Sequence, residues 1–163
     1  MVSGFTRVPL ITYAFSWEKG IMAYSALDVA KYVIAHENNQ GRNITNLRLQ
    51  KLLYFVQAKV LCEGNDECFS DEMEAWDFGP VAPDVYHNYK VFGAMNLTET
   101  SKPPRFLAHE ELIDSMLDNC AKFSTNKLVE ITHRQKPWKD AYAKGRGTVI
   151  PNEEIKKFFI NGN

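Results

Sequence analysis

Paired cysteines and paired histidines are the first features that this sequence lacks. Its 163 residues include three cysteines, an odd number with no C-x-x-C pair: Cys62, Cys68 and Cys120. A secreted disulfide framework is therefore not supported, and we expect free thiols in a reducing cytoplasm. The cysteine spacing does not fit a zinc knuckle, and the four histidines show no H-x-x-x-H pattern, so the sequence predicts no metal site and no cofactor.

Long apolar runs and an excess of charge of one sign are also missing. No run of about 18 apolar residues occurs, so no membrane span is supported. The formal net charge of -1 argues against a general basic field for nucleic acid. The charge is uneven, because residues 60–118 hold thirteen Asp/Glu against three Lys/Arg, and residues 122–163 hold nine Lys/Arg against four Asp/Glu. This distribution fits either a dipolar protein that steers a charged partner or two solvated faces that partly neutralise each other.

Helical periodicity and helix-end signals are what the sequence has in quantity. Apolar residues recur at helical spacing between cap residues such as Ser25 and either Thr45 or Asn46 and stop signals such as Gly64. The predicted helices cover residues 26 to about 40, 46–64, 83–93, 109–123, 126–134, 138–144 and 152–160. Short extended segments are predicted around residues 69–77 and near Ile150. We therefore expect a mainly α, compact single-domain bundle of about six to seven helices with a minor short β element.

The first 21 residues do not share this organisation. They contain a short apolar run at Val8–Phe15 and no small-residue cleavage site of the usual form. Since a helix signal follows Met22 directly, we interpret residues 22–163 as the functional domain. Residues 1–21 are then an N-terminal extension, either an alternative start upstream of a true start at Met22 or a loosely attached segment. Residues 1–21 also contain no helix-turn-helix pattern, so an added DNA-binding module is not supported.

Two blocks of sequence carry a resemblance to a known family. The first contains NLRLQKLLYFVQA and EAWDFGPVAPDVYHNYKVFG, and the second contains LVEITHRQKPWKDAY and IPNEEIKKFF. They resemble the Panacea domain, also described as SocA-like or GepA-type, and the likeness covers Tyr24 to about Phe159. The positions that match the family's motifs are Leu49, Lys51, Leu52, Leu53, Tyr54, Phe55, Glu74, Ala75, Trp76, Gly79, Pro80, Val81, Pro83, Val85, Tyr86, Thr132, His133, Pro137 and Trp138.

The resemblance implies binding and not catalysis. Domains of this family are antitoxins of bacterial or prophage toxin–antitoxin pairs and neutralise varied toxins by direct contact, and at least one member is thought to deliver its toxin to a protease. By this resemblance we expect a cytoplasmic antitoxin without enzymatic activity. Its expected partner is a cognate toxin protein, with a protease adaptor as a second class of partner, and the resemblance leaves the oligomeric state open.

The stretch WDFGPVAP has a structural and a binding interpretation. Glycine allows positive φ and proline restricts φ, so the stretch predicts a rigid corner. The structural motif comprises Gly79, Pro80, Val81 and Pro83, with His133 and Pro137 of the second block. Rigid aromatic side chains also lose little entropy on binding, which suits a binding hot spot. We expect the following aromatic residues to contact a partner: Trp76, Phe78, Tyr86 and Trp138.

Two polar residues in the helix that begins near residue 46 allow two interpretations. Gln50 and Lys51 lie one helical face away from the leucine stripe, which is typical of ordinary solvated residues. If they line a groove together with Tyr54, they become polar contacts for a partner. We include all three among the expected partner-binding residues.

An enzyme is the alternative class of function. The group that the sequence offers is His133 with the acidic residues Glu74 and Asp77, but no serine or cysteine lies in a nucleophile motif. A buried histidine that bonds to backbone and packs near an indole is the structural interpretation. A nucleic-acid role, which we do not favour, would give a DNA affinity that falls steeply with salt and would use Lys136, Lys139, Lys144 and Arg146.

Overall fold

The computed structural model describes residues 24–100 and 108–162 of the chain. Helices in these residues are α1 (Ala26–Asn39), α2 (Asn46–Lys59), the π-helical turn η1 (Val60–Gly64), α3 (Pro83–Tyr89), the 3-10 turn η2 (Lys90–Phe92), α4 (Glu110–Cys120), α5 (Thr125–Arg134), α6 (Lys136–Ala143) and α7 (Asn152–Asn161). The strands are β1 (Met73–Trp76), β2 (Gly79–Val81) and β3 (Val149–Ile150). The expected mainly α fold with a minor β element is confirmed. Our interpretation of residues 1–21 and Met22 falls outside the described residues.

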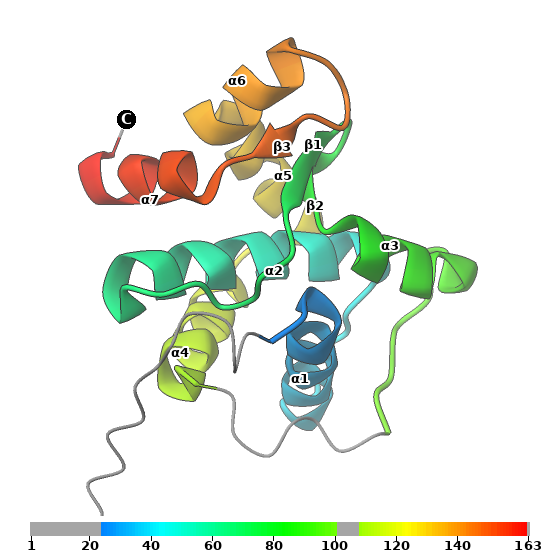
Figure 1. The fold of residues 1–163 in the computed structure, drawn as a ribbon. Helices are drawn as coiled ribbons and strands as arrows, with labels where there is room; N and C mark the ends of the chain where they lie inside the picture. The colour runs from blue at the N-terminus through cyan, green and yellow to red at the C-terminus, as the bar shows by residue number, and fades with distance from the viewer. Residues whose placement is uncertain (1–23, 101–107, 163) are drawn as a thin grey trace, which may run out of the picture.

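Helix α2 lies at the centre of the molecule. It contacts α1, α3, α4, α5, α7 and β2, and in Figure 1 it crosses the middle, with α1 and α4 on one side and the sheet, α6 and α7 on the other. Every residue from Arg48 to Ala58 is buried as a result. A surface helix buries only one apolar stripe, so the polar side chains of α2 have to find partners inside the protein.

Side-chain caps fix where the first two helices begin. The hydroxyl of Ser25 accepts a hydrogen bond from the backbone nitrogen of Asp28 at 3.1 Å, and the Asp28 carboxylate accepts one from the backbone nitrogen of Ser25, which closes a capping box. The hydroxyl of Thr45 accepts a hydrogen bond from the backbone nitrogen of Arg48 at 3.2 Å. Both caps agree with the sequence prediction.

Several helix boundaries differ from those that the sequence predicts, including the end of α4, which lies at Cys120 and not near residue 123. The α-helical part of the second helix ends at Lys59, and the chain reaches Gly64 as a π-helical turn. Helix α6 begins at Lys136, two residues before the predicted start at Trp138, and it therefore includes Pro137 in its first turn. Proline is tolerated there because the first backbone N–H groups of a helix have no partner within the helix.

Three short strands form one antiparallel sheet in the order β2-β1-β3. The pairs Trp76–Gly79 and Met73–Ile150 define its register. Strands β1 and β3 correspond to the two extended segments that we predicted. Strand β2 was missed, because a Gly-Pro pair indicates a break in regular structure. Pro80 can sit in β2 because this strand is at the edge of the sheet, where one side needs no ladder hydrogen bond.

The three cysteines all lie in the described part of the chain and are free thiols, as expected. Burial raises the pKa of Cys68 and of Cys120 to about 12, so both thiols stay protonated at neutral pH. Among the described helices, none combines the length and apolar character needed to cross a bilayer.

Candidate functional site

The buried polar side chains of α2 hold the stretch WDFGPVAP, which we predicted to be a rigid corner. Gln50, Lys51 and Tyr54 are each at most 1% exposed. The amine of Lys51 donates a hydrogen bond to the carbonyl oxygen of Pro80 at 2.6 Å, and the amide oxygen of Gln50 accepts one from the backbone nitrogen of Ala82 at 2.9 Å. The structure differs from both expectations for these residues. Their side chains are enclosed by the protein, so they offer no surface to a partner in this conformation.

Lys51 and Gly79 meet inside the protein. Within the described residues Lys51 has no carboxylate partner, and burial lowers the pKa of its amine from the ordinary 10.5 to about 7. Gly79 has φ +103°, as the corner interpretation requires. A Cβ atom at this position would lie 2.8 Å from Nζ of Lys51 and 2.7 Å from Oγ1 of Thr132. Both the backbone angle and the lack of space therefore require glycine at position 79.

Further buried hydrogen bonds connect α2 to other segments. We use the name internal frame for the buried polar side chains of α2 that make these bonds, which are Asn46, Gln50, Lys51 and Tyr54. The side-chain amide of Asn46 donates to the carbonyl oxygen of Tyr86 at 3.1 Å and accepts from the amide of Gln50 at 2.9 Å. The hydroxyl of Tyr54 donates to the side-chain oxygen of Gln135 at 2.8 Å, at the junction of α5 and α6. Helix α2 thus holds the backbone of β2 and α3 and, through the side chain of Gln135, the junction that leads into α6.

Trp138 is the middle ring of a stack of three. Its centroid lies 4.3 Å from that of His133 with planes 28° apart, and 4.7 Å from that of Tyr142 with planes 17° apart. The indole nitrogen of Trp138 donates to the carbonyl oxygen of Trp76 at 2.9 Å, which joins the stack to β1. His133 does pack beside an indole, but its buried Nε2 has no hydrogen-bond partner in the described part of the chain, where we expected a bond to backbone.

Trp76 is held on several sides and remains half-buried. Its ring meets that of Tyr86 edge to face with centroids 4.9 Å apart. The guanidinium of Arg146 lies 4.5 Å from its centroid, a cation–π contact, and its indole nitrogen donates to the carboxylate of Glu74 at 2.8 Å. We define the aromatic strip as the half-buried residues Trp76, Tyr86, His133, Trp138 and Tyr142.

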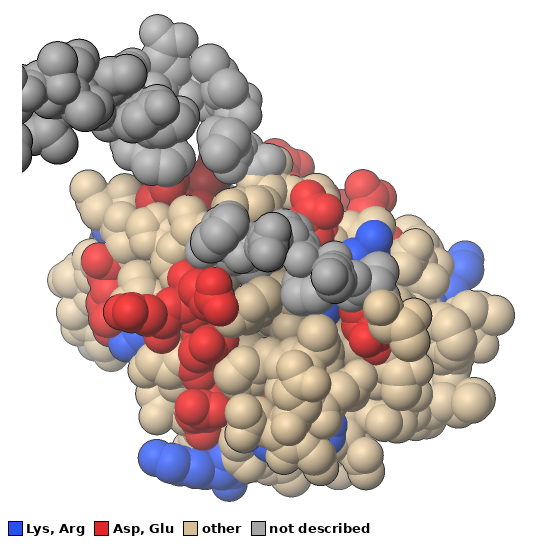
Figure 2. Space-filling model, turned by 90° about the horizontal axis from the view of Figure 1, so that it is seen from below, with Lys and Arg blue, Asp and Glu red and all other residues tan. Residues whose placement is uncertain are grey.

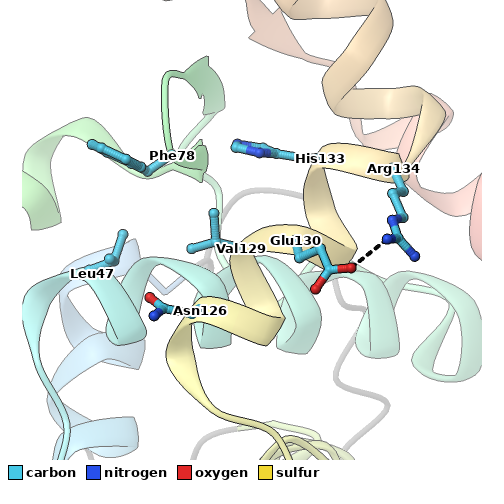
Figure 3. Close-up of a pocket in the computed structure, with 7 residues that line it drawn as sticks. All are labelled: Leu47, Phe78, Asn126, Val129, Glu130, His133 and Arg134. Carbon is cyan, nitrogen blue, oxygen red and sulfur yellow. Dashed lines mark hydrogen bonds and ion pairs between the residues drawn. The ribbon is translucent and has the colours of Figure 1, made fainter.

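An open pocket of about 450 Å³ adjoins the aromatic strip (Figure 3). It is lined by residues of α2, of α5 and of the turn between β1 and β2: Leu47, Phe78, Asn126, Val129, Glu130, His133 and Arg134. Phe78 is 65% exposed, and in Figure 3 the rings of Phe78 and His133 lie on either side above Val129. Apolar walls with a few polar groups at the edge are typical of a site that grips another molecule.

The acid–base group considered for an enzyme is not assembled. The carboxylate of Glu74 accepts from the indole of Trp76, and that of Asp77 accepts from the hydroxyl of Tyr142 at 2.8 Å. Neither carboxylate is hydrogen-bonded to His133. The residues that the structure describes contain no group of three or more side chains able to hold a metal ion.

Several residues of this region, among them Tyr142 and most of the residues that line the pocket, were not among the expected site residues. Tyr142 lies one helical turn after Trp138, and this i, i+4 spacing would have identified it. Leu47 and Val129 have no comparable local signal, and Arg146 was considered only for a nucleic-acid role. They reach the site only because α5 packs on α2 and because the chain turns into β3 beside β1.

Comparison with known proteins covers most of the segment that builds this site. Residues 49–139 match the model of the family described as antitoxin SocA-like, Panacea domain. The chain is also similar to Antitoxin SocA of Caulobacter vibrioides (strain NA1000 / CB15N), with 33% identity over 119 residues, which cover 64% of this chain and 63% of that relative's length. No solved structure matches the chain significantly. Because the family match spans more than half of the chain and includes motif residues of both blocks, the chain belongs to the antitoxin SocA-like, Panacea domain family.

Proposed function

We propose that this protein is an antitoxin that binds a toxin protein directly and neutralises it without catalysis. Membership of the family and the similarity to an antitoxin support the role. The main structural support for direct binding is the stack of the His133, Trp138 and Tyr142 rings. A hydrogen bond from Trp138 to the carbonyl oxygen of Trp76 joins this stack to β1. Its three free thiols fit a reducing cytoplasm, where we expect the protein to act.

The contacts that we propose are Trp76, Phe78, Tyr86 and Trp138. Tryptophan and tyrosine dominate the binding energy of many interfaces, because they bury a large area with few rotatable bonds. The rings of Trp76, Tyr86 and Trp138 are already ordered by contacts within the protein, so binding a partner costs these residues little further conformational entropy. Phe78 projects from the rigid turn that Lys51 holds and supplies the most exposed ring of the group.

Co-expression with the gene encoded beside this one tests the proposal. A toxic neighbour should be rescued by the wild-type chain, and the two proteins should purify together in a fixed ratio. Replacing Trp138 or Phe78 by Ala should weaken rescue, whereas Phe92→Ala, which removes an exposed ring elsewhere, should not. A toxic neighbour that the wild-type chain fails to rescue would contradict the antitoxin role.

The same strains distinguish the ways in which a toxin is neutralised. Masking by contact leaves the amount of toxin unchanged on an immunoblot, whereas delivery to a protease lowers it. Enzymatic reversal would need less than one antitoxin per toxin and would fail in His133→Gln. We expect an unchanged amount of toxin and a requirement for at least equimolar antitoxin.

A further inference from the structure

We infer that the pocket between Phe78, Val129 and His133 takes one apolar side chain of the partner polypeptide, and that acidic residues flank this side chain. The inference rests on the proposed function and specifies the chemistry of the partner segment. Three observations on this face of the molecule support it: the apolar walls, the unpaired histidine nitrogen and the local charge.

The walls of the pocket determine which kind of partner side chain fits into it. Leu47 and Val129 form its floor, and the exposed ring of Phe78 stands at its edge (Figure 3). An exposed phenylalanine on a rigid turn gains free energy when a partner covers it, in proportion to the apolar area removed from water. Since the pocket is open to solvent and not enclosed, it suits a side chain such as Leu, Met or Phe projecting from a larger molecule.

His133 favours a partner segment that also has polar groups beside the apolar side chain. Its ring forms one wall, is fixed from behind by Trp138 at 4.3 Å, and keeps a buried nitrogen without a partner in the described part of the chain. A buried polar atom of this kind is stabilised when it gains a hydrogen bond. A polypeptide that inserts an apolar side chain into the pocket brings backbone N–H and C=O groups close to this ring.

The charge around the pocket favours an acidic partner. Residues 125–146, which contain α5 and α6, hold six Lys/Arg and two Asp/Glu. Both acids are already paired, Glu130 with Lys127 and Arg134, and Asp140 with Lys136, and Arg146 pairs with Asp77 of the neighbouring turn at 3.5 Å. Lys139 and Lys144 have no ion pair in the described part of the chain, so these two residues leave positive charge on this side of α2.

The opposite side of the molecule has the reverse character. Figure 2, seen from the side of α1 and α4, shows a band of Asp and Glu side chains. A partner with acidic flanking residues is attracted to the α5 side and repelled from this band, so charge would orient it during the encounter.

Random linear peptides displayed on phage and selected on the full-length protein provide the probe. We expect the enriched peptides to share one Leu, Met or Phe with Asp or Glu nearby. The peptides, synthesised with a fluorophore, should bind the wild-type chain and lose affinity by about tenfold or more in Val129→Arg, which fills the pocket, and in Arg134→Glu. Met95→Arg, the same kind of change at another exposed apolar residue, is the matched control and should bind as the wild type does.

Several results would overturn the inference. These are the enrichment of peptides without acidic residues, no enrichment at all, or binding that Val129→Arg leaves unchanged. Sedimentation of the wild-type protein alone as a dimer that Val129→Arg dissociates would identify a second copy as the occupant instead. If Val129→Arg does not fold by circular dichroism, Phe78→Ala replaces it, because that side chain is mostly in solvent.

Failure of this inference is distinguishable from failure of the proposed function. If the wild-type chain does not rescue its toxic neighbour, the antitoxin proposal fails. If the wild-type chain and the folded Val129→Arg variant rescue equally well, the antitoxin proposal stands and the assignment of the pocket is wrong.

Discussion

The amine of Lys51 donates a hydrogen bond to the carbonyl oxygen of Pro80 at 2.6 Å, deep inside the protein and without a carboxylate partner in the described residues. The bond fixes the edge strand β2 and, with it, the turn that presents Phe78. Holding a turn with a buried lysine is unfavourable, since the charged amine loses its hydration. Because of that penalty, the free energy of unfolding should depend on pH, and unfolding measurements can test the arrangement.

Stability should rise with pH because of Lys51. Its folded-state pKa of about 7 lies below the ordinary value of 10.5, so between these values the unfolded chain binds a proton that the folded protein lacks. The destabilisation is complete below pH 7 and is relieved as the pH rises toward 10.5. From pH 7 to pH 9 the wild type should gain about 2–3 kcal/mol relative to Lys51→Met.

Urea unfolding at a series of pH values measures this difference. Lys139→Met is the matched control, because Lys139 is exposed and makes no ion pair in the described part of the chain. The control should keep the wild-type slope. Parallel pH profiles for the wild type and Lys51→Met would show that the amine is not held in the buried, largely neutral state that we infer.

Gly79→Ala should destabilise the fold by about 2–4 kcal/mol, because it combines a strained positive φ with a Cβ placed against Lys51 and Thr132. Gly41→Ala separates the two effects, since Gly41 has φ +69° and no atom within 4 Å of the position that a Cβ would occupy. It should cost only about 1 kcal/mol. Chemical denaturation gives both values, and equal losses would remove the steric part of the explanation.

Tyr54→Phe should cost about 1–3 kcal/mol, because it leaves the buried side-chain oxygen of Gln135 without its donor. Tyr142→Phe removes a hydroxyl that donates to Asp77 at the surface, where water replaces the lost bond, and should cost about 0.5 kcal/mol or less. Thermal unfolding of the two variants tests the ranking. A larger loss for Tyr142→Phe would mean that the frame around Tyr54 contributes little.

Trp76→Ala and Phe78→Ala should differ in their effect on folding. The indole of Trp76 contacts Tyr86, Arg146 and Glu74, so its removal should cost about 1–3 kcal/mol. Phe78 is 65% exposed, and its removal should change stability by less than about 0.5 kcal/mol. Guanidinium unfolding of the two variants measures these losses of stability. Weakened toxin binding by Phe78→Ala at unchanged stability would identify a contact residue, whereas a large loss of stability would make Phe78 a structural one.

Local signals in the sequence predicted most of the helices, because capping and periodicity depend on residues close together in the chain. Ser25 and Thr45 mark helix starts through bonds made three residues away, and such bonds form whatever the rest of the fold does. Strand β2 was missed for the converse reason. Its partner is β1, and only its place at the edge of the sheet makes Pro80 acceptable.

For the site, the sequence indicated which aromatic residues to consider but not which neighbours would hold them. Trp76 and Trp138 were identified from their motifs, although 62 positions separate them, and the bond between them exists only after β1 packs beside α6. Gln50 and Lys51 were misjudged because periodicity assumes that a helix has one solvated face.

The sequence by itself therefore determined the helices, their caps and the rigid corner at Gly79, since these follow from the covalent and steric preferences of neighbouring residues. Only the tertiary structure decided that α2 would be enclosed on all sides. That enclosure turned its polar residues into an internal frame and left the aromatic strip and Phe78 at the surface.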